Sequence, residues 1–200
     1  TYKGHVATST LYPGKKTLVE VTTQTVHSRL LLRPSNQINE TVLGILGRAQ
    51  ELYGAQISGY AFLSNHYHVL VVVDSAKQLA DFMTYFNSNL AREVGRLVQW
   101  REKFWARRYR AIVVSGEEAA QRERLKYVLS HGAKEGLVST PLEWPGAHAL
   151  RPLLTGEPVT GIWLDRTQEY AARRRGEDFE RLRYATLHRV FGESCALTTL

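Results

Sequence analysis

Two histidines in the middle of the chain have the spacing of a metal site. His66 and His68 lie two residues apart in HYHVLVVV (66–73), a segment with the apolar, β-branched composition of a strand. Alternate side chains of a strand point to opposite faces, so both imidazoles share one face. Neutral imidazole is a common ligand of divalent metals. Spacing alone favours a simpler arrangement, in which one ring is hydrogen-bonded in the core and the other is exposed at the strand end.

A tyrosine and a third histidine follow on a segment with helical character. Tyr127 and His131 are four residues apart, so they share a helix face, away from the apolar stripe of Leu125 and Leu129. If this helix crosses the sheet edge that carries the other two histidines, three imidazoles and a phenol meet. A metal held by three imidazoles can polarise a phosphodiester oxygen as a Lewis acid. A phenol with a pKa of about 10 is a poor nucleophile at neutral pH, so it needs a nearby cation or base.

Basic residues outnumber acidic residues. The 26 Lys and Arg against 19 Asp and Glu give a net charge of +7, which fits a polyanionic partner such as nucleic acid. Arg107, Arg108 and Arg110 stand in FWARRYR (104–110), a mixture of cations and aromatic rings that single-stranded nucleic acid favours. Lys126, just before the tyrosine, is a further candidate contact. The alternative for the arginine segment is a solvated strand edge whose aromatic residues face the core.

Composition excludes several classes of protein. The 200 residues suffice for one domain with a short appendage, and 44% apolar and 22% charged residues exclude wholesale disorder. The single cysteine, Cys195, cannot pair within the chain, which fits a reducing compartment. The longest apolar run, VLVVV (69–73), is too short to span a membrane, and the first sixteen residues lack the apolar core of a signal peptide. We therefore expect a soluble, cytoplasmic protein with no membrane partner.

Hydrophobic patterns place these residues on a mixed α and β scaffold. Four segments read as strands: 17–32 (broken near His27), 57–63, 66–73 and 104–114. Three segments have helical spacing, the last two after capping boxes at Ser75 and Ser115: 38–52, 75–97 and 115–131. The order β-α-β-β-α-β-α predicts an α+β fold, with helices packed on a ferredoxin-like antiparallel sheet.

The chain divides into three parts. Residues 1–16 are expected to be an N-terminal arm, residues 17–150 the functional domain, and residues 151–200 a basic C-terminal extension with a helical piece from about 165. Three histidines have no partner pattern and are expected at the surface: His5, His148 and His188.

Several segments resemble one family of DNA-processing enzymes. NHYHVLVVVD (65–74) resembles the His-hydrophobic-His strand of the HUH nuclease superfamily. YVLSHGAKEGLVSTPLEWP (127–145) resembles the tyrosine helix and following segment of REP-associated tyrosine transposases. Further segments also look like that family: TVHSR (25–29), GRAQELYG (47–54) and NSNLAREVGR (87–96). The resemblance covers about residues 22–148 in the same order.

The resemblance implies an activity and roles for particular residues. Such transposases have the HUH endonuclease fold, use Mg²⁺ or Mn²⁺, and act on single-stranded DNA beside a palindromic hairpin. By resemblance, His66 and His68 would be metal ligands, and Tyr127 the nucleophile that attacks a DNA phosphorus and leaves a 5′-phosphotyrosine link. The position four residues after the tyrosine usually holds an amide that completes the metal site. Here it holds His131, followed by Gly132 in place of a proline.

Two other functions stay open from the sequence. A non-catalytic DNA hairpin-binding protein, descended from a transposase, would keep the basic surface but would need neither three metal ligands nor the tyrosine. An RNA hairpin-binding protein would use the sheet and its aromatic residues. The oligomeric state is left between monomer and homodimer, because in relatives the tyrosine helix serves either its own protomer or a partner's. The expected location is the cytoplasm, at the bacterial nucleoid.

Overall fold

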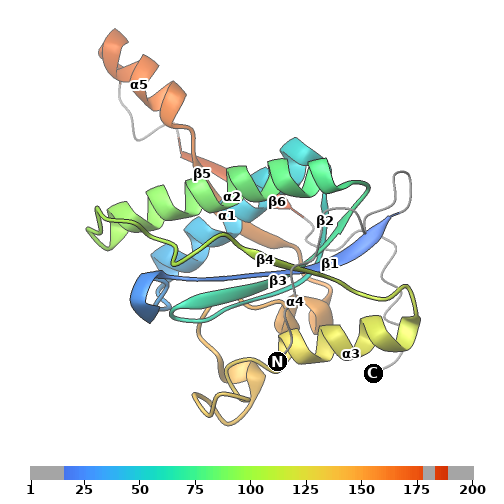
Figure 1. Ribbon diagram of the computed structural model, residues 1–200. Coiled ribbons are helices and arrows are strands. Elements are labelled where there is room, and N and C mark those ends of the chain that lie inside the picture. The colour runs from blue at the N-terminus through green and yellow to red at the C-terminus, as the bar shows by residue number, and fades with distance from the viewer. Residues whose placement is uncertain (1–15, 178–182, 189–200) are drawn as a thin grey trace.

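A four-stranded antiparallel sheet forms the centre of the molecule (Figure 1). The computed structural model describes residues 16–177 and 183–188, the latter as backbone only. The strands follow the order β2-β3-β1-β4 across the sheet. Their bounds are β1 (Thr17–Gln24), β2 (Gln56–Phe62), β3 (His66–Val73) and β4 (Arg110–Val113). This is the order of a ferredoxin-like sheet, and the predicted fold class is confirmed.

Helices cover both faces of the sheet. α1 (Asn36–Tyr53) and α2 (Ala76–Leu97) lie together on one face, whereas α3 (Glu118–Leu129) packs against β2 and β3 on the other (Figure 1). Ser75 caps α2, as the sequence predicts, and Gly54 ends α1 with a left-handed φ of 64°.

Successive side chains of β3 point alternately toward the helices on one face of the sheet and toward α3 on the other. The Tyr67 hydroxyl donates to Asn87 on α2 at 2.6 Å. His66 and His68 face the opposite side, toward the helix that carries Tyr127. The period-2 pattern of the strand therefore separates a packed core on one face from polar chemistry on the other.

Three predicted boundaries are wrong in detail. The strand expected over 17–32 ends at Gln24, and the 3₁₀ turn η2 (Val26–Ser28) follows it. The strand expected over 104–114 is limited to Arg110–Val113, because Phe104 is buried in a loop that joins the end of β1 by isolated hydrogen bonds. The helix expected over 115–131, α3, begins at Glu118, and the predicted cap Ser115 lies outside it. The Ser115 hydroxyl instead accepts the N–H of a residue still outside the helix.

The C-terminal extension is built onto the helical layer. The short helix η3 (Pro141–Glu143) precedes the extension. The extension itself contains most of α4 (Leu150–Thr155), then β5 (Val159–Leu164), α5 (Arg166–Arg175) and β6 (Arg183–His188). The expected helical piece is α5, but the antiparallel ribbon of β5 and β6 is not predicted. β5 lies directly on α1, where glycines let the backbones touch. A Cβ atom on Gly44 would lie 2.2 Å from the carbonyl carbon of Ile162.

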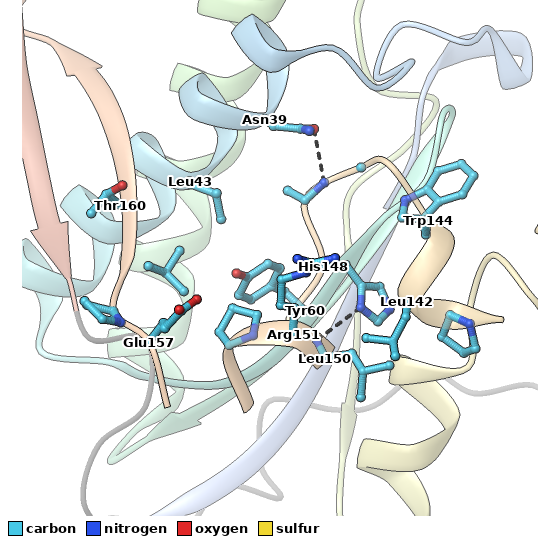
Figure 2. A pocket seen from close by; sticks show the side chains of 16 residues that line it. Asn39, Leu43, Tyr60, Leu142, Trp144, His148, Leu150, Arg151, Glu157 and Thr160 are labelled. Carbon is cyan, nitrogen blue, oxygen red and sulfur yellow. Dashed lines mark hydrogen bonds between the residues drawn. The ribbon is translucent and has the colours of Figure 1, made fainter. Parts of the chain in front are cut away.

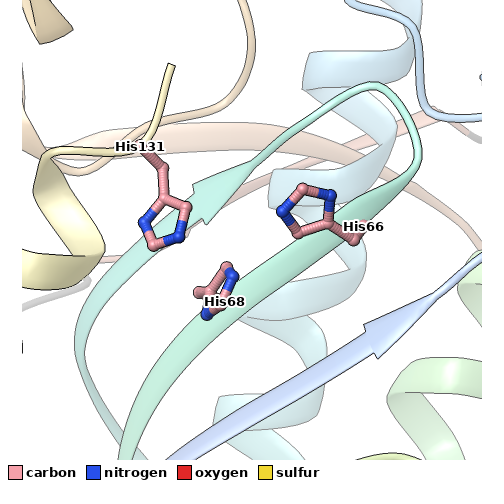
Figure 3. Close-up of side chains that lie close together, drawn as sticks. All are labelled: His66, His68 and His131. Carbon is pink, nitrogen blue, oxygen red and sulfur yellow. The ribbon is translucent and has the colours of Figure 1, made fainter. Parts of the chain in front are cut away.

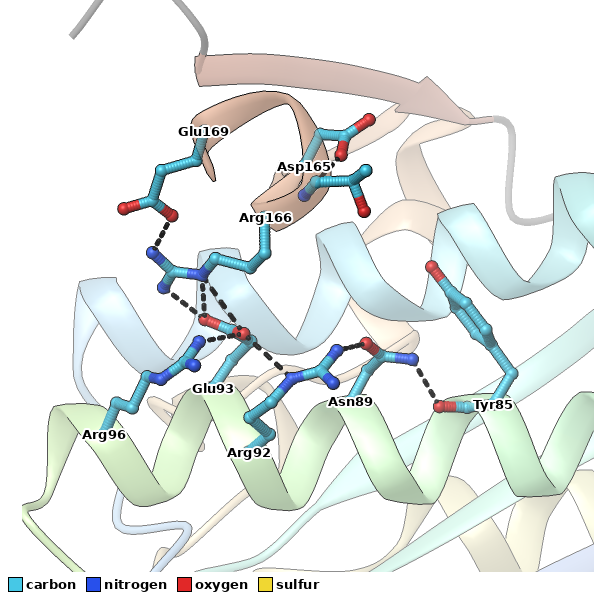
Figure 4. Close-up of polar contacts among 9 residues, drawn as sticks. Tyr85, Asn89, Arg92, Glu93, Arg96, Asp165, Arg166 and Glu169 are labelled. Carbon is cyan, nitrogen blue, oxygen red and sulfur yellow. Dashed lines mark hydrogen bonds and ion pairs between the residues drawn. The ribbon is translucent and has the colours of Figure 1, made fainter. Parts of the chain in front are cut away.

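A buried carboxylate also ties the extension to α2 (Figure 4). Glu93 accepts hydrogen bonds from Arg96 on its own helix, at 2.7 Å, and from Arg166 at the start of α5. Arg166 also donates to Glu169 at 2.6 Å. The hydrogen bonds to Glu93, with those to Glu169, raise the pKa of the Arg166 guanidinium. Residues far apart in the sequence are thus joined by a charge network that burial strengthens.

Candidate metal and nucleophile site

Three imidazoles converge on the face of the sheet that α3 covers (Figure 3). His66 and His68 come from β3, and His131 follows the last turn of α3. One nitrogen of each ring lies within 4.8 Å of the others. The ring centroids of His68 and His131 are 4.0 Å apart, and those of His66 and His68 are 5.4 Å apart. The structure therefore brings together the three histidines that the sequence offers as candidate metal ligands.

Each of these rings is held through its Nδ1 atom by an oxygen acceptor. His68 Nδ1 lies 2.7 Å from a carboxylate oxygen of Glu20, and His66 Nδ1 lies 2.7 Å from the amide oxygen of Asn65. His131 Nδ1 lies 3.1 Å from the backbone carbonyl of Val128. Because these oxygens accept, each Nδ1 must carry the proton, which leaves a lone pair on each Nε2. This is the arrangement of metal-ligating histidines, whose other ring nitrogen donates to an outer acceptor.

The charge state of the rings also fits metal binding. Burial, reinforced by the neighbouring rings, lowers the pKa of His66 to about 4. Burial and the nearby His68 lower the pKa of His131 as well. Both rings are therefore neutral near pH 7, and the neutral form is the one that can ligate a cation.

A buried glutamate supports the cluster from β1. Glu20 is 2% exposed and accepts from His68 through one oxygen and from Arg124 Nη1, at 2.9 Å, through the other. Burial alone would raise the pKa of this carboxyl, but its interactions with His68 and with the Arg124 guanidinium outweigh burial, and the pKa is lowered. The sequence analysis missed both residues. A single glutamate in the apolar strand TLVEVTTQ was the available signal for Glu20.

We expect Glu20→Gln to weaken Mn²⁺ binding by about tenfold or more, because an amide loses the charge that fixes the His68 tautomer. Titration calorimetry of the metal-free protein measures this effect. Glu40→Gln, which neutralises an exposed glutamate on α1, is the matched control and should bind as the parent does. Equal affinity of the Glu20 and Glu40 variants would contradict a supporting role for Glu20.

Tyr127 lies beside the three imidazoles. Its ring centroid is 4.8 Å from that of His131 and 5.9 Å from that of His68. The side chain is 36% exposed, so a large substrate can reach it. Within one chain, the structure thus places a phenol at the edge of a candidate metal site.

Two cations flank this phenol. Lys134 Nζ lies 4.1 Å from the centroid of the Tyr127 ring, and the Arg124 guanidinium lies 5.5 Å from it. The sequence predicts the need for a nearby cation or base but identifies neither residue. Their proximity to the ring depends on how α3 and the loop after it fold.

A strained turn after β1 holds Asn65, the residue whose side chain accepts from His66. His27 and Ser28 have φ of 49° and 54°, uncommon for residues other than glycine. This turn packs on Asn65, whose backbone oxygen accepts from the N–H and hydroxyl of Thr25 and whose amide donates to the Ser28 carbonyl. The break predicted near His27 is confirmed, and it fixes the start of β3.

The basic residues selected from the sequence lie at the surface. Arg107, Arg108 and Arg110 are exposed at the start of β4, and Arg108 stacks on Tyr109 at 5.4 Å. Lys126 is exposed on α3, with its Nζ 3.5 Å from Glu123. The aromatic residues of the arginine segment are less available than the cations. Phe104 and Trp105 belong to the core, and the Trp105 indole donates to a backbone carbonyl of α2.

One histidine expected at the surface is not there. His148 is half-buried, and its Nδ1 accepts the N–H of Leu150 at 3.1 Å. Burial, and to a lesser extent the His131 ring, lowers its pKa to about 4. The reason is a backbone bridge to Ala61, which holds the segment of His148 along the edge of β2. The side chains of His5 and His188 lie outside the described residues.

We expect protein stability to fall as the pH drops from about 6.5 to about 4. In that window His148 protonates in the unfolded chain but not in the folded one, so the unfolded state binds more protons and acid favours it. The contribution of this one ring is at most about 3 kcal/mol. Urea unfolding of the parent and of His148→Gln at pH 7.5 and 4.5 measures it. The variant should lose less stability than the parent, and an equal loss would contradict burial of a neutral His148.

A cavity of about 320 Å³ lies beside this edge segment (Figure 2). It opens between Leu43 of α1, Tyr60 of β2 and the residues that lead into β5. Trp144 forms part of its wall, donates to the Phe62 carbonyl and also packs against Gly132 after α3. The lining includes neither Tyr127 nor the three clustered histidines, so this cavity is separate from the candidate site.

Comparisons with known proteins give one family match and similar solved structures. The chain matches the model of the family described as Transposase IS200 like over residues 22–130, more than half of its length. It is similar to a solved REP-associated tyrosine transposase bound to a REP hairpin, with a TM-score of 0.56 and 15% identity, over 72% of this chain and 84% of that one. This likeness is one of fold.

A second solved structure is more distant. It is a candidate transposase from Deinococcus radiodurans R1, with a TM-score of 0.43 and 16% identity over 64% of this chain and 96% of that one. No curated protein matches the chain. Among the described residues, no helix has the length and apolar character needed to cross a membrane.

Proposed function

This chain belongs to the IS200-like transposase family, and we propose that it is a metal-dependent endonuclease and strand transferase acting on single-stranded DNA. The observation that carries this proposal is the position of Tyr127 beside three clustered imidazoles of the same chain. A protein that only binds DNA needs neither the phenol nor three clustered metal ligands. Because one chain supplies every group, a monomer is sufficient for the reaction.

In the proposed reaction, the Tyr127 hydroxyl attacks a DNA phosphorus. A bond forms between the tyrosine oxygen and phosphorus, and the bond from phosphorus to the 3′-oxygen breaks. The phenol loses its proton to solvent, and the leaving oxygen takes up a proton to become a free 3′-hydroxyl. Lys134 and Arg124, whose cationic groups lie beside the Tyr127 ring, would offset the negative charge of the phosphate that is attacked. The 5′-phosphotyrosine ester conserves the bond energy, so attack by another 3′-hydroxyl rejoins DNA without ATP.

The three histidines provide the place for the cation. His66, His68 and His131 would hold Mg²⁺ or Mn²⁺, which supplies Lewis-acid polarisation of a phosphate oxygen. Glu20, Asn65 and the Val128 carbonyl keep the rings in the ligating tautomer. Because these hydrogen bonds are made within the protein alone, they would orient the rings before DNA arrives.

The proposed substrate is single-stranded DNA beside a palindromic hairpin, as in REP-associated transposases. The fold likeness to a hairpin-bound REP-associated tyrosine transposase supports this choice, as does the exposed basic surface. Arg107, Arg108, Arg110 and Lys126 would neutralise backbone phosphates. An enzyme that processes genomic repeats would act in the cytoplasm, at the nucleoid.

A cleavage experiment tests the proposal. Labelled hairpin oligonucleotides drawn from the repeats that flank the gene are incubated with the protein and Mg²⁺ or Mn²⁺, with EDTA as the control. The proposal predicts metal-dependent cleavage on one side of the hairpin and preference for DNA over an RNA hairpin of matched sequence. Tight binding without cleavage at any metal concentration would favour the non-catalytic DNA-binding function, and preference for the RNA hairpin would favour the RNA-binding function.

A further inference from the structure

Glu135 has no role in the proposed reaction, and its carboxylate lies next to the histidine cluster. Glu135 is four residues beyond His131, and its side chain is 32% exposed. One of its oxygens, Oε2, accepts the backbone N–H of Gly132 at 2.5 Å, which anchors the carboxylate. The other oxygen, Oε1, lies 3.7 Å from His131 Nε2. That nitrogen carries the lone pair that would face a metal.

The separation of these two atoms is close to that of two donors on one ion. Two ligand atoms each about 2.1 Å from a cation are about 3.0 Å apart at right angles and about 3.4 Å apart in a tetrahedron. The gap of 3.7 Å therefore needs only a small rotation of a partly exposed side chain. The backbone at Gly132, with a φ of 93°, turns the chain so that Glu135 comes back toward His131.

Charge gives a second reason for this position. Three imidazoles bring no negative charge to a divalent cation, and the nearby side chains of Arg124 and Lys134 are positive. Imidazole suits Zn²⁺, Ni²⁺ and Cu²⁺, whereas carboxylate oxygen suits Mg²⁺ and Mn²⁺. An anionic oxygen in the cluster would therefore offset the cations and adapt a nitrogen-rich site to a harder metal.

We propose that Glu135 is a fourth, anionic ligand of the metal that the three histidines hold. This inference rests on the proposed function, and it makes the site one of three nitrogens and one oxygen. It predicts that the metal-free protein binds Mn²⁺ without DNA, and that Glu135 sets the preference of the site between Mn²⁺ and Ni²⁺.

The test is titration calorimetry of the EDTA-treated full chain with MnCl₂ and, separately, with NiCl₂. In Glu135→Gln the amide oxygen still accepts from Gly132, but the anionic donor is lost. We expect Mn²⁺ affinity to fall at least about tenfold and Ni²⁺ affinity to fall by much less. Glu123→Gln, which removes the same charge from an exposed position on α3, should bind both metals as the parent does. Circular dichroism checks that each variant is folded.

The other outcomes overturn the inference in distinguishable ways. Equal losses for both metals would assign Glu135 to holding the Gly132 turn rather than to the metal. Unchanged Mn²⁺ affinity in Glu135→Gln, with binding lost in His68→Ala, would leave the three-histidine site intact without a fourth ligand. If the parent binds neither metal, the metal site of the proposed function fails as well.

Discussion

Tyr127→Phe is expected to abolish strand cleavage, with a loss of at least about a thousandfold, while hairpin affinity stays within about twofold of the parent. The substitution removes only the oxygen that attacks phosphorus. The phenyl ring keeps its contacts with His131 and Lys134, so the local packing is retained. Cleavage is measured on labelled hairpin DNA in denaturing gels, and affinity by a mobility shift in EDTA.

Tyr170→Phe is the matched control for this change. Tyr170 is 64% exposed on α5 and lies outside the candidate site, so its variant should cleave at the parental rate. If Tyr127→Phe cleaved at the parental rate too, the phenol would not be the nucleophile, and the interpretation of α3 as a catalytic helix would be wrong.

His68→Ala is expected to lower Mn²⁺ affinity by at least about a hundredfold and to remove metal-dependent cleavage. His68 is the central ring of the cluster, in contact with both His66 and His131, and it is the ring that Glu20 orients. Its loss removes one donor and leaves the Glu20 carboxylate paired with Arg124 alone. Calorimetry measures the affinity, and cleavage assays across Mn²⁺ concentrations measure the activity.

His27→Asn provides a control for the loss of an imidazole. His27 is exposed at the turn after β1 and has a left-handed backbone, which asparagine tolerates. This variant should bind Mn²⁺ as the parent does. Full metal affinity in His68→Ala would contradict the assignment of the cluster as a metal site.

Local pattern predicted which of the clustered side chains share a face, but not that the two faces meet. The period of a strand places His66 and His68 on one face, and the period of a helix places Tyr127 near His131. Those rules depend only on neighbours in sequence. The crossing of α3 over the sheet brings the two pairs together.

The supporting residues could not be predicted in this way. Glu20 contacts His68 across 48 positions and Arg124 across 104, and no local pattern contains such distances. The cation beside the phenol, Lys134, depends on the turn after α3. The C-terminal ribbon was missed for a similar reason, since β5 is held by close backbone packing on α1 rather than by a recognisable strand pattern.

The most direct test of the account is to identify the covalent bond itself. The protein is incubated with hairpin DNA and Mn²⁺, denatured, digested with protease and analysed by mass spectrometry for peptides that carry a nucleotide. The account predicts a metal-dependent adduct on the peptide that contains Tyr127, joined through a 5′-phosphate. An adduct on another residue, or cleavage of the DNA with no covalent adduct, would contradict it.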